Sequence, residues 1–430
     1  MAAVQPVAGD ALESLPRRFG RYQLFDRIGR GGMAEIFLAR ADTGIAGASR
    51  LLVVKQIHAA LSGDPKFAAM FAGEAKLCAG LRHANIVQIV DLGRADGPNG
   101  ASLLFMAMEY VEGLDLNQLL RRLSQKKVAL PLEFAILIVR EVLSALDFAH
   151  RATDESGRAL GIVHRDVSPS NVLMSLEGEV KLCDFGIAKA FATSSPDGEA
   201  KVVGKSAYMS PEQAHGDELD GRADVFAAGI LLWELCAGRR LYRGSEDEML
   251  DQARRGDVPP LPDRGIPGQE TLQALLDRAL ATDREERFAT AAQMREELDA
   301  YAAQARMFAS PIRFGAFLTD QFEAEIVADR RAREQAAKAA EGIVDAPESS
   351  GSAVVPIPTS GRPPSDEVAI ADLPTPLPSQ PPRASSTPPA GALQVAPPEE
   401  EDDGYVMPIV IASAAVILIA IAVAIYFLLW

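Results

Sequence analysis

The sequence predicts an α+β fold in two lobes of different size and character. Between residues 22 and 109 the apolar residues come in short runs, such as 51–54 and 86–92, which are typical of strands. One helical stretch, at about 65–81, interrupts these runs. From Leu114 onward helical patterns dominate. We therefore expect a small sheet with one helix, followed by a larger and mainly helical lobe.

The composition narrows the function classes. Lys and Arg total 43 against 59 Asp and Glu, and the net charge of the 430 residues is -16. Such an acidic chain lacks the basic surface that nucleic-acid binding requires, so we expect no nucleic-acid partner. The three cysteines, Cys78, Cys183 and Cys236, are too scattered for a disulfide framework or a zinc site. A reducing compartment is the simplest interpretation.

The segments outside the two lobes differ from one another in composition. Residues 1–21 are small, polar and non-periodic, which predicts a flexible arm that is not a secretory signal peptide. Residues 303–345 mix Ala, Glu, Arg and Gln, which predicts a charged helical extension. Residues 346–404 are rich in Pro, Ser and acidic groups, which predicts a disordered tether.

The segment 407–430 is 24 residues long and carries no charge. About 20 such residues suffice to cross a bilayer. A buried core helix is the alternative, but the length of the run and its place after the tether favour one transmembrane helix. We expect a single pass, with all preceding residues in the cytoplasm.

A glycine-rich segment follows the start of the small lobe. Its glycines let backbone N–H groups approach phosphate oxygens. A Rossmann phosphate turn shares the Gly-x-Gly start but opens a helix, whereas residues 36–38 have the pattern of a strand. The strand favours a hairpin lid over a nucleotide. The segment comprises Ile28, Gly29, Arg30, Gly31, Gly32, Met33, Ala34, Glu35 and Ile36.

One lysine and one glutamate of the small lobe form a candidate ion pair. Lys55 ends an apolar, β-branched run, where a strand can hold its ammonium group against anionic phosphates. A lone lysine at a strand end is usually only solvated. Glu74 lies on the predicted helix, however, and could reach back to Lys55.

Three side chains with oxygen donors recur within 19 positions, on predicted loops between short strands. Asp166 can accept the proton of an attacking hydroxyl group. Asn171 and Asp184 offer the hard oxygen ligands that Mg²⁺ prefers beside phosphate. Any one of these residues alone would be an ordinary polar loop residue, but the ordered set makes that interpretation improbable.

Together these segments resemble a protein kinase of the eukaryotic-like (Hanks-type) serine/threonine class found in bacteria. The resemblance covers 22–302, with a small lobe at 22–111 and a large lobe at 112–302, and it implies the two-lobed protein kinase fold. The matching motifs, in order, are the glycine segment, Lys55, Glu74, His164-Arg165-Asp166 to Asn171, Asp184-Phe185-Gly186, Ser210-Pro211-Glu212 and Asp224.

The resemblance also implies cofactors and roles. ATP and Mg²⁺ (or Mn²⁺) would bind between the lobes, and Lys55, braced by Glu74, would hold the α and β phosphates. Asp166 would be the catalytic base, and Asn171 and Asp184 would hold the metal ion. The adenine would be enclosed by side chains of Ile28, Ile36, Val53, Met108 and Leu173 and by the backbone of Glu109 and Val111.

Other matched positions imply structural and regulatory roles. Asp224 would anchor the backbone of the catalytic loop, and Glu212 would pair with Arg287. Arg165, directly before Asp166, implies control by a phosphate on the activation segment. The candidate acceptors are Thr193, Ser194, Ser195 and Ser206.

Two positions depart from the family pattern. The lysine usually found two residues after the catalytic aspartate is Ser168, and the threonine usually found after Gly204 is Lys205. The same chemical groups are therefore present in exchanged positions. Our hypothesis is that Lys205 neutralises charge on the transferred phosphoryl group while Ser168 hydrogen-bonds Asp166. Alternatively, Lys205 is solvated and Ser168 is a neutral loss.

The function that we expect is phosphoryl transfer to protein hydroxyl groups in bacterial signalling, at the cytoplasmic face of the inner membrane. The segment 168–171 is closer to the serine/threonine pattern than to the tyrosine pattern. A pseudokinase that binds ATP as a scaffold is the alternative, and a kinase of small molecules is a third class. The expected partners are protein substrates and the membrane, and a homodimer for autophosphorylation stays open.

Overall fold

The computed structural model describes residues 15–41, 50–97, 100–185 and 206–341. All of them belong to one of the chain's two compact units, Met1–Gly361. Four predictions lie wholly or mostly outside the described residues: the N-terminal arm, the tether, the apolar segment 407–430, and the activation-segment positions Thr193, Ser194, Ser195 and Lys205. Within the predicted arm, Arg17–Phe19 form a strand of the small-lobe sheet, so the flexible-arm prediction is wrong for these residues. No helix in the described part of the chain is long and apolar enough to cross a membrane.

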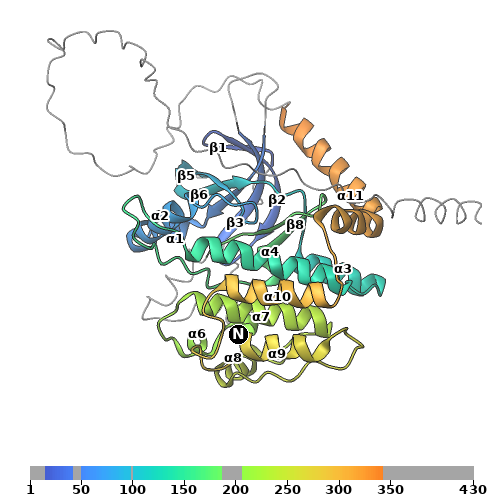
Figure 1. Ribbon diagram of the computed structural model, residues 1–430. Helices are drawn as coiled ribbons and strands as arrows, with labels where there is room; N and C mark the ends of the chain where they lie inside the picture. Colours follow the sequence, from blue (N-terminus) through green and yellow to red (C-terminus); the bar gives the residue numbers. More distant parts are fainter. Residues whose placement is uncertain (1–14, 42–49, 98–99, 186–205, 342–430) are drawn as a thin grey trace, which may run out of the picture. The chain divides into compact units, whose positions relative to one another are not determined.

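The small lobe is built on an antiparallel sheet, to which six strands of the described chain contribute in the order β1-β2-β3-β4-β6-β5 (Figure 1). Alternate residues of a strand face opposite sides of a sheet. In β4, Val54 therefore packs with Phe37 and Phe105 on one side, while Val53 and Lys55 face the other. The strands are β1 (Arg17–Phe19), β2 (Tyr22–Arg30), β3 (Ala34–Ala41), β4 (Leu51–Ile57), β5 (Ile89–Asp96) and β6 (Ser102–Glu109).

The helical stretch predicted near 65–81 is helix α2 (Pro65–Ala79), which follows the single turn α1 (Ala59–Ser62). Asp64 caps α2, because its carboxylate accepts hydrogen bonds from two backbone N–H groups of the first turn. Phe67 and Phe71 bury one face of α2 against the sheet.

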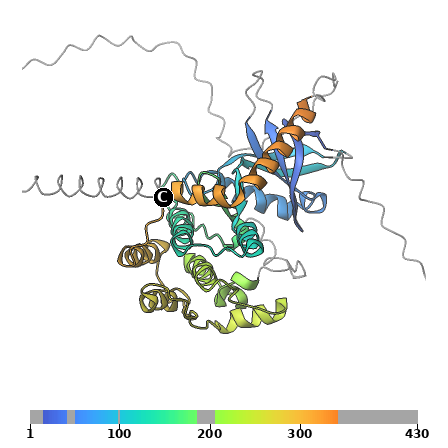
Figure 2. The same ribbon diagram turned by 90° about the vertical axis from the view of Figure 1, so that its right-hand side faces the viewer.

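The large lobe packs its helices around α7, which is buried along nearly its whole length and lies against α4 (Figures 1 and 2). A small sheet of the described residues, in the order β7-β8-β9, lies toward the small lobe. The helices are α3 (Leu116–Lys126), α4 (Leu132–His150), α6 (Pro211–His215), α7 (Gly221–Ala237), α8 (Glu246–Arg255), α9 (Gln269–Ala279) and α10 (Ala291–Gln304). The short strands are β7 (Gly113–Asp115), β8 (Val172–Ser175) and β9 (Val180–Leu182), and the 3-10 helices are η2 (Pro169–Asn171) and η3 (Ser206–Tyr208). The predicted two-lobed fold is thereby confirmed.

The segment predicted as a charged extension contains α11 (Pro311–Glu341), whose first half is part of the large-lobe core. Phe314, Leu318 and Phe322 lie four residues apart, so they share one helix face, and all three are buried. A Cβ atom on Gly315 would lie 2.7 Å from the backbone oxygen of Leu176. The glycine therefore allows α11 to approach the β8–β9 turn closely.

Candidate active site

The glycine segment forms a hairpin, as predicted. Strands β2 and β3 pair in antiparallel fashion, and the Gly31 N–H donates to the Ala34 carbonyl across the turn at 2.8 Å. His58 holds the tip, because its N–H donates to the Met33 carbonyl at 3.0 Å and its Nε2 lies 2.9 Å from the Gly31 carbonyl oxygen. A Rossmann turn would continue into a helix here, so that alternative is wrong.

Charged side chains at the base of the hairpin pair with each other. The Glu35 carboxylate lies 3.0 Å from Arg27 and 3.6 Å from Arg30. The two arginines are largely exposed, and exposed pairs contribute about 1 kcal/mol at most. These residues brace the hairpin and do not line the nucleotide cavity described below.

Lys55 is held at the inner end of the site by a carboxylate. Register places it opposite Ile36 of β3 on one side and Met106 of β6 on the other. Its Nζ lies 2.8 Å from Asp184 Oδ1. Burial alone would lower the pKa of Lys55, but the charge and hydrogen bond of Asp184, with smaller contributions from Cys183 and Asp166, together raise it. Lys55 therefore stays charged.

Glu74 does not brace Lys55 in this structure, and that expectation is corrected here. Among the described residues the ion pair of Lys55 is with Asp184, and Glu74 Oε2 is buried without a hydrogen-bond partner. Burial raises the pKa of Glu74, and the charge of Arg165 opposes this only in part. Two carboxylates compete for one ammonium group, and Asp184 has it in this conformation.

The catalytic loop orients Asp166 through its neighbours. Asn171 Nδ2 donates to the Asp166 carbonyl at 2.7 Å and to its Oδ2 at 3.1 Å. The Asp166 N–H donates to His164 Nδ1 at 3.2 Å, and His164 Nε2 lies 3.0 Å from the Cys183 carbonyl oxygen. Burial lowers the pKa of His164, so the ring is neutral and carries its proton on Nε2. Asp166 is largely buried, with 9% of its surface exposed.

Asp224 anchors this loop from below, in the role that the resemblance implies. Its carboxylate accepts hydrogen bonds from the His164 and Arg165 N–H groups at 2.7 and 2.8 Å, and His150 Nε2 lies 2.8 Å away. Burial would raise the pKa of Asp224, but the bond from His150 and the other donors lower it. Arg165 has a φ of 63°, a left-handed conformation that costs a non-glycine residue about 1–2 kcal/mol. Asp224 provides the bonds that offset this cost.

The Asp184 segment is fixed by the aromatic ring next to it. Phe185 is buried and packs on the His164 ring at a centroid distance of 4.5 Å. Asp184 itself has a φ of 59°, which turns its carboxylate toward Lys55 while Phe185 enters the core. The Cys183 N–H donates to the Asn171 carbonyl at 2.9 Å, so the two predicted metal-binding segments lie side by side.

The donor set fits a hard divalent cation. Asp184 offers carboxylate oxygens, and because the Asn171 amide nitrogen donates to Asp166, its side-chain oxygen is the atom that could bind a metal ion. Groups of three or more His, Cys, Asp or Glu that could hold an ion by themselves do not occur in the described residues. A metal ion here would therefore share its coordination with phosphate oxygens, as Mg²⁺ usually does.

Glu212 and Arg287 form the buried ion pair that the resemblance implies. Two guanidinium nitrogens of Arg287 donate to the two carboxylate oxygens of Glu212, at 2.6 and 2.8 Å. Burial would raise the pKa of Glu212, but the bonds from Arg287 lower it. The pair ties α6 to the loop before α10.

A cavity of about 400 Å³ lies between the lobes, within the size range of small-molecule sites. It brings together residues predicted to surround ATP from five strands and from the segments around Val111 and Asp184. Those that line it are Ile28, Ile36, Val53, Lys55, Met108, Glu109, Val111, Leu173 and Asp184.

Sequence reasoning missed several cavity residues. Asp115 and Gln118 lie at the start of α3, where an N-cap aspartate was a visible signal. The others include residues from α11, for which no local signal existed, because they lie more than a hundred positions from the motifs. The missed residues are Asp26, Val87, Tyr110, Gly113, Leu114, Asp115, Gln118, Arg122, Ser170, Cys183, Asp329, Ala332 and Arg333.

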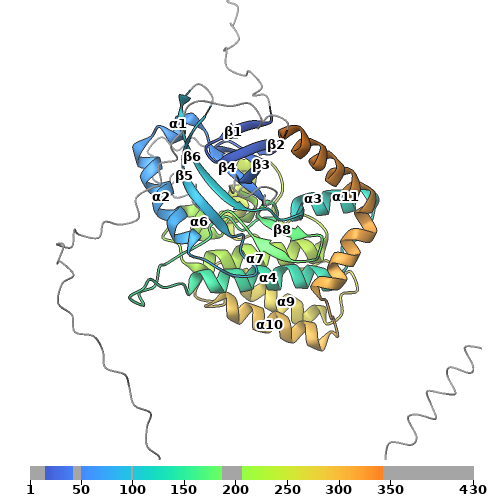
Figure 3. The same cartoon turned by 90° about the horizontal axis from the view of Figure 1, so that it is seen from above.

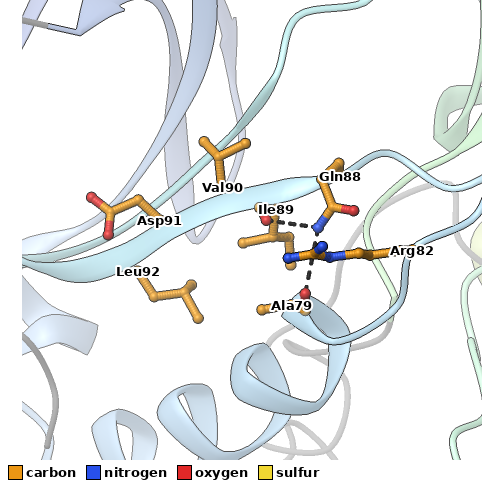
Figure 4. Close-up of a pocket in the computed structure, with 7 residues that line it drawn as sticks. All are labelled: Ala79, Arg82, Gln88, Ile89, Val90, Asp91 and Leu92. Carbon is orange, nitrogen blue, oxygen red and sulfur yellow. Dashed lines mark hydrogen bonds between the residues drawn. The ribbon is translucent and has the colours of Figure 1, made fainter. Parts of the chain in front are cut away.

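A second pocket lies between the end of α2 and β5, and none of the predicted site residues lines it (Figure 4). Its Gln88 amide is already bonded to the carbonyl oxygens of Ile89 and Ala79. The pocket contains one cation, Arg82, but no counterparts of Asp166, Asn171 and Asp184, so we do not regard it as the active site.

The two positions that depart from the family pattern are only partly described. The Ser168 hydroxyl lies 3.1 Å from that of Ser170, and the described structure does not bring it to Asp166 as expected. The Ser206 hydroxyl is buried and donates to Glu246 at 2.5 Å. A phosphate group on Ser206 would be repelled by the negatively charged carboxylate of Glu246. This conformation therefore disfavours Ser206 as the acceptor. The hypothesis for Lys205 stays a prediction.

Comparison with known proteins decides the family. A family model of the protein kinase domain matches residues 22–298, well over half of the chain. This chain belongs to the protein kinase family. The kinase domain of Mycobacterium tuberculosis PknI has a similar structure, with a TM-score of 0.50 and 29% identity over 68% of this chain and 98% of that one.

Two curated relatives extend the comparison. The chain is 37% identical to the tyrosine-protein kinase MasK of Myxococcus xanthus over 326 residues, 76% of this chain and 50% of MasK. It is 37% identical to the serine/threonine-protein kinase PknB of Mycobacterium tuberculosis over 65% of this chain and 42% of PknB. The chain thus spans half or less of the length of these relatives. The MasK alignment is too long to end at residue 298, so it continues into the segment that contains α11.

Proposed function

We propose that this kinase transfers the γ-phosphoryl group of ATP to serine or threonine hydroxyl groups of proteins in bacterial signalling. One observation carries the proposal: a single cavity joins an apolar, nucleotide-sized space to Lys55 and Asp184, with the Asp166–Asn171 pair on the adjoining loop. That arrangement supplies binding, charge neutralisation and a base in one place.

The residues of the chain would divide the reaction between them. Lys55 would leave Asp184 and bind phosphate oxygens of the nucleotide, while Asp184 and Asn171 would hold the metal ion. A bound Mg²⁺ would neutralise phosphate charge. Asp166, oriented by Asn171, would accept the proton of the substrate hydroxyl group. Glu74 would then take up Lys55, which requires α2 to approach β4.

Serine and threonine are the proposed acceptors, although the relatives carry both kinds of name. The residues Ser168-Pro169-Ser170-Asn171 favour serine and threonine, and several of the relatives are named serine/threonine kinases. The test is phosphoamino-acid analysis of a generic protein after incubation with the kinase, ATP and Mg²⁺. Phosphotyrosine as the main product would contradict the acceptor assignment, and loss of transfer in EDTA with recovery in Mg²⁺ or Mn²⁺ is expected.

A pseudokinase scaffold is the second candidate, and one observation favours it. The Lys55–Asp184 pair and the separate Glu74 mean that the described conformation is not arranged for transfer. The two functions separate cleanly in one assay, because a pseudokinase would bind ATP and show no more transfer than Lys55→Met.

The proposed location is the cytoplasmic face of the inner membrane, with residues 407–430 as the anchor. The support is the uncharged length of this segment and the proline-rich tether before it. Carbonate washing of membranes tests this: the full-length kinase should stay in the pellet, and deletion of 407–430 should release it. A full-length kinase that washes off would contradict the anchor.

A further inference from the structure

The second half of α11 leaves the large-lobe core and reaches β2 of the small lobe (Figure 3). Its attachment to α3 is electrostatic: Glu325 lies 2.8 Å from Arg122 and 2.9 Å from Lys126. Arg122 also lies 3.8 Å from Asp329, one turn further along α11. The helix is therefore held to α3 over two turns just before it reaches the cavity.

Beyond that point α11 contacts the segment that joins the lobes. The guanidinium carbon of Arg333 lies 5.6 Å from the centre of the Tyr110 ring, a cation–π contact. Ala336 packs with Tyr110 beside the buried small-lobe residues Phe25 and Leu38. One helix, from outside the region matched by the family model, thus touches both lobes.

Three α11 residues, Asp329, Ala332 and Arg333, line the nucleotide cavity together with Tyr110 and Val111. Ala332 and Arg333 follow Asp329 by three and four positions, so both lie on the same side of the helix as Asp329. Arg333 is half-buried, and the carboxylate of Asp26 on β2 lies near enough to interact with its charge. A guanidinium group has five N–H donors and no acceptor, so it presents donors to whatever fills the cavity.

Helix α11 could either form one wall of the cavity or block the cavity. The volume of the cavity distinguishes these two roles. With α11 in place the cavity still measures about 400 Å³, within the 300–1,000 Å³ typical of ligand sites. A blocking segment would have filled the space between Val53 and Leu173, whereas the α11 residues lie beside Tyr110 at its edge. The geometry favours a wall.

We propose that α11 is a wall of the nucleotide site and that Arg333 contacts the adenosine part of the bound nucleotide. This rests on the proposed function, in which the cavity binds ATP. Lys55 and Asp184 mark the phosphate end of the cavity. Arg333 lies against Tyr110, next to the Glu109 and Val111 backbone that would bind the adenine, so it lies at the other end.

The test compares Arg333→Ala with Arg331→Ala, an exposed arginine on the same helix that does not line the cavity. Calorimetry on the full chain would measure the Kd values of ATP with Mg²⁺ and of adenosine alone. We expect Arg333→Ala to raise both Kd values about 10-fold, which corresponds to the loss of one hydrogen bond from a charged donor. Arg331→Ala should change neither Kd value. Lys55→Met should weaken the binding of ATP but not that of adenosine.

Each result has a distinct meaning. Unchanged affinities in Arg333→Ala would overturn the proposal, and so would a loss confined to ATP, which would place Arg333 at the phosphates. Tighter binding in Arg333→Ala would show that α11 covers the site instead of forming it. Failure of the wild type to bind ATP would refute the proposed function. Arg333→Met keeps a long aliphatic side chain on the helix without a charged donor, so it replaces Arg333→Ala if that variant unfolds, with the same outcomes.

Discussion

Lys55 and Glu74 show how a residue can be predicted correctly while its partner is not. The motif spacing identified both side chains, but the choice of partner depends on where α2 lies relative to β4. In the described conformation Asp184 holds Lys55, and a carboxylate oxygen of Glu74 is buried without a partner. A buried carboxylate oxygen without a partner destabilises the fold. We therefore expect Glu74 to form an ion pair in another conformation, which would offset this loss of stability.

Glu74→Gln should therefore change stability and activity in opposite directions. Because burial raises the pKa of Glu74, its charged form destabilises the folded state at neutral pH, and the amide removes that penalty. Thermal unfolding at pH 7 should occur at an equal or higher temperature. The transfer rate should fall about 10- to 100-fold, because Lys55 would lose the brace proposed for the conformation that transfers phosphate. A variant that is destabilised but fully active would contradict both parts.

The Glu212–Arg287 pair makes a pH-dependent contribution whose sign is fixed. Its carboxyl pKa is below the ordinary value of 4.5, so the stabilisation is fully present above pH 4.5 and is lost as the pH falls through the lowered pKa. Glu212→Gln leaves a buried guanidinium without its partner and should destabilise the fold by about 3–5 kcal/mol at pH 7.

Denaturant unfolding of wild type and Glu212→Gln between pH 7 and pH 3 would measure this contribution. The gap in unfolding free energy should narrow as the pH falls below 4.5 and through the lowered pKa of Glu212, where the folded wild-type carboxyl also becomes neutral. An equal gap at every pH would show that packing, not charge, makes the difference. Glu270→Gln, at a position in the exposed first turn of α9, is the matched control and should show little effect.

At the scale of elements, α11 is the part that the sequence described least well. Its alternation of Ala, Glu and Arg predicted a charged extension, but Phe314, Leu318 and Phe322 at spacings of four form a buried face. That spacing was visible in the sequence. The partner of the face was not, because the helix packs on elements that precede it by more than a hundred residues.

Gly315 provides a test of how α11 docks. In the interior of most helices, replacing Gly by Ala stabilises the helix by about 1 kcal/mol. At Gly315 the added Cβ would lie 2.7 Å from backbone atoms of Leu176 and Glu177, which cannot give way as a side-chain end can. We expect Gly315→Ala to destabilise by about 1–3 kcal/mol, since overpacking outweighs propensity.

Gly73→Ala on α2 is the matched control for Gly315→Ala, because nothing lies within 4 Å of the added Cβ there. It should stabilise by up to about 1 kcal/mol. Chemical denaturation of both variants gives the comparison. If the two alanines have the same effect, α11 is not docked as described.

At the scale of the whole molecule, the sequence predicted the two lobes, the hairpin lid and the chemical groups of the site. These could be predicted because each depends on a local pattern: strand-length apolar runs, a glycine turn before a strand, and oxygen donors at fixed spacing around Asp166. The Lys55–Asp184 pair and the α11 wall could not, because they depend on which distant elements meet. The predictions for Lys205, Thr193, Ser194 and Ser195 remain to be tested.

The central claim is that the groups around Asp166 perform phosphoryl transfer. The most direct measurement is the transfer of labelled γ-phosphate from ATP to a generic protein in the presence of Mg²⁺, with wild type and Asp166→Ala assayed side by side and their folding checked by thermal unfolding. We predict that the wild type incorporates phosphate and that folded Asp166→Ala loses at least about 100-fold of the rate, as expected when a general base is removed. Equal incorporation by both proteins, or none above background by either, would contradict the claim.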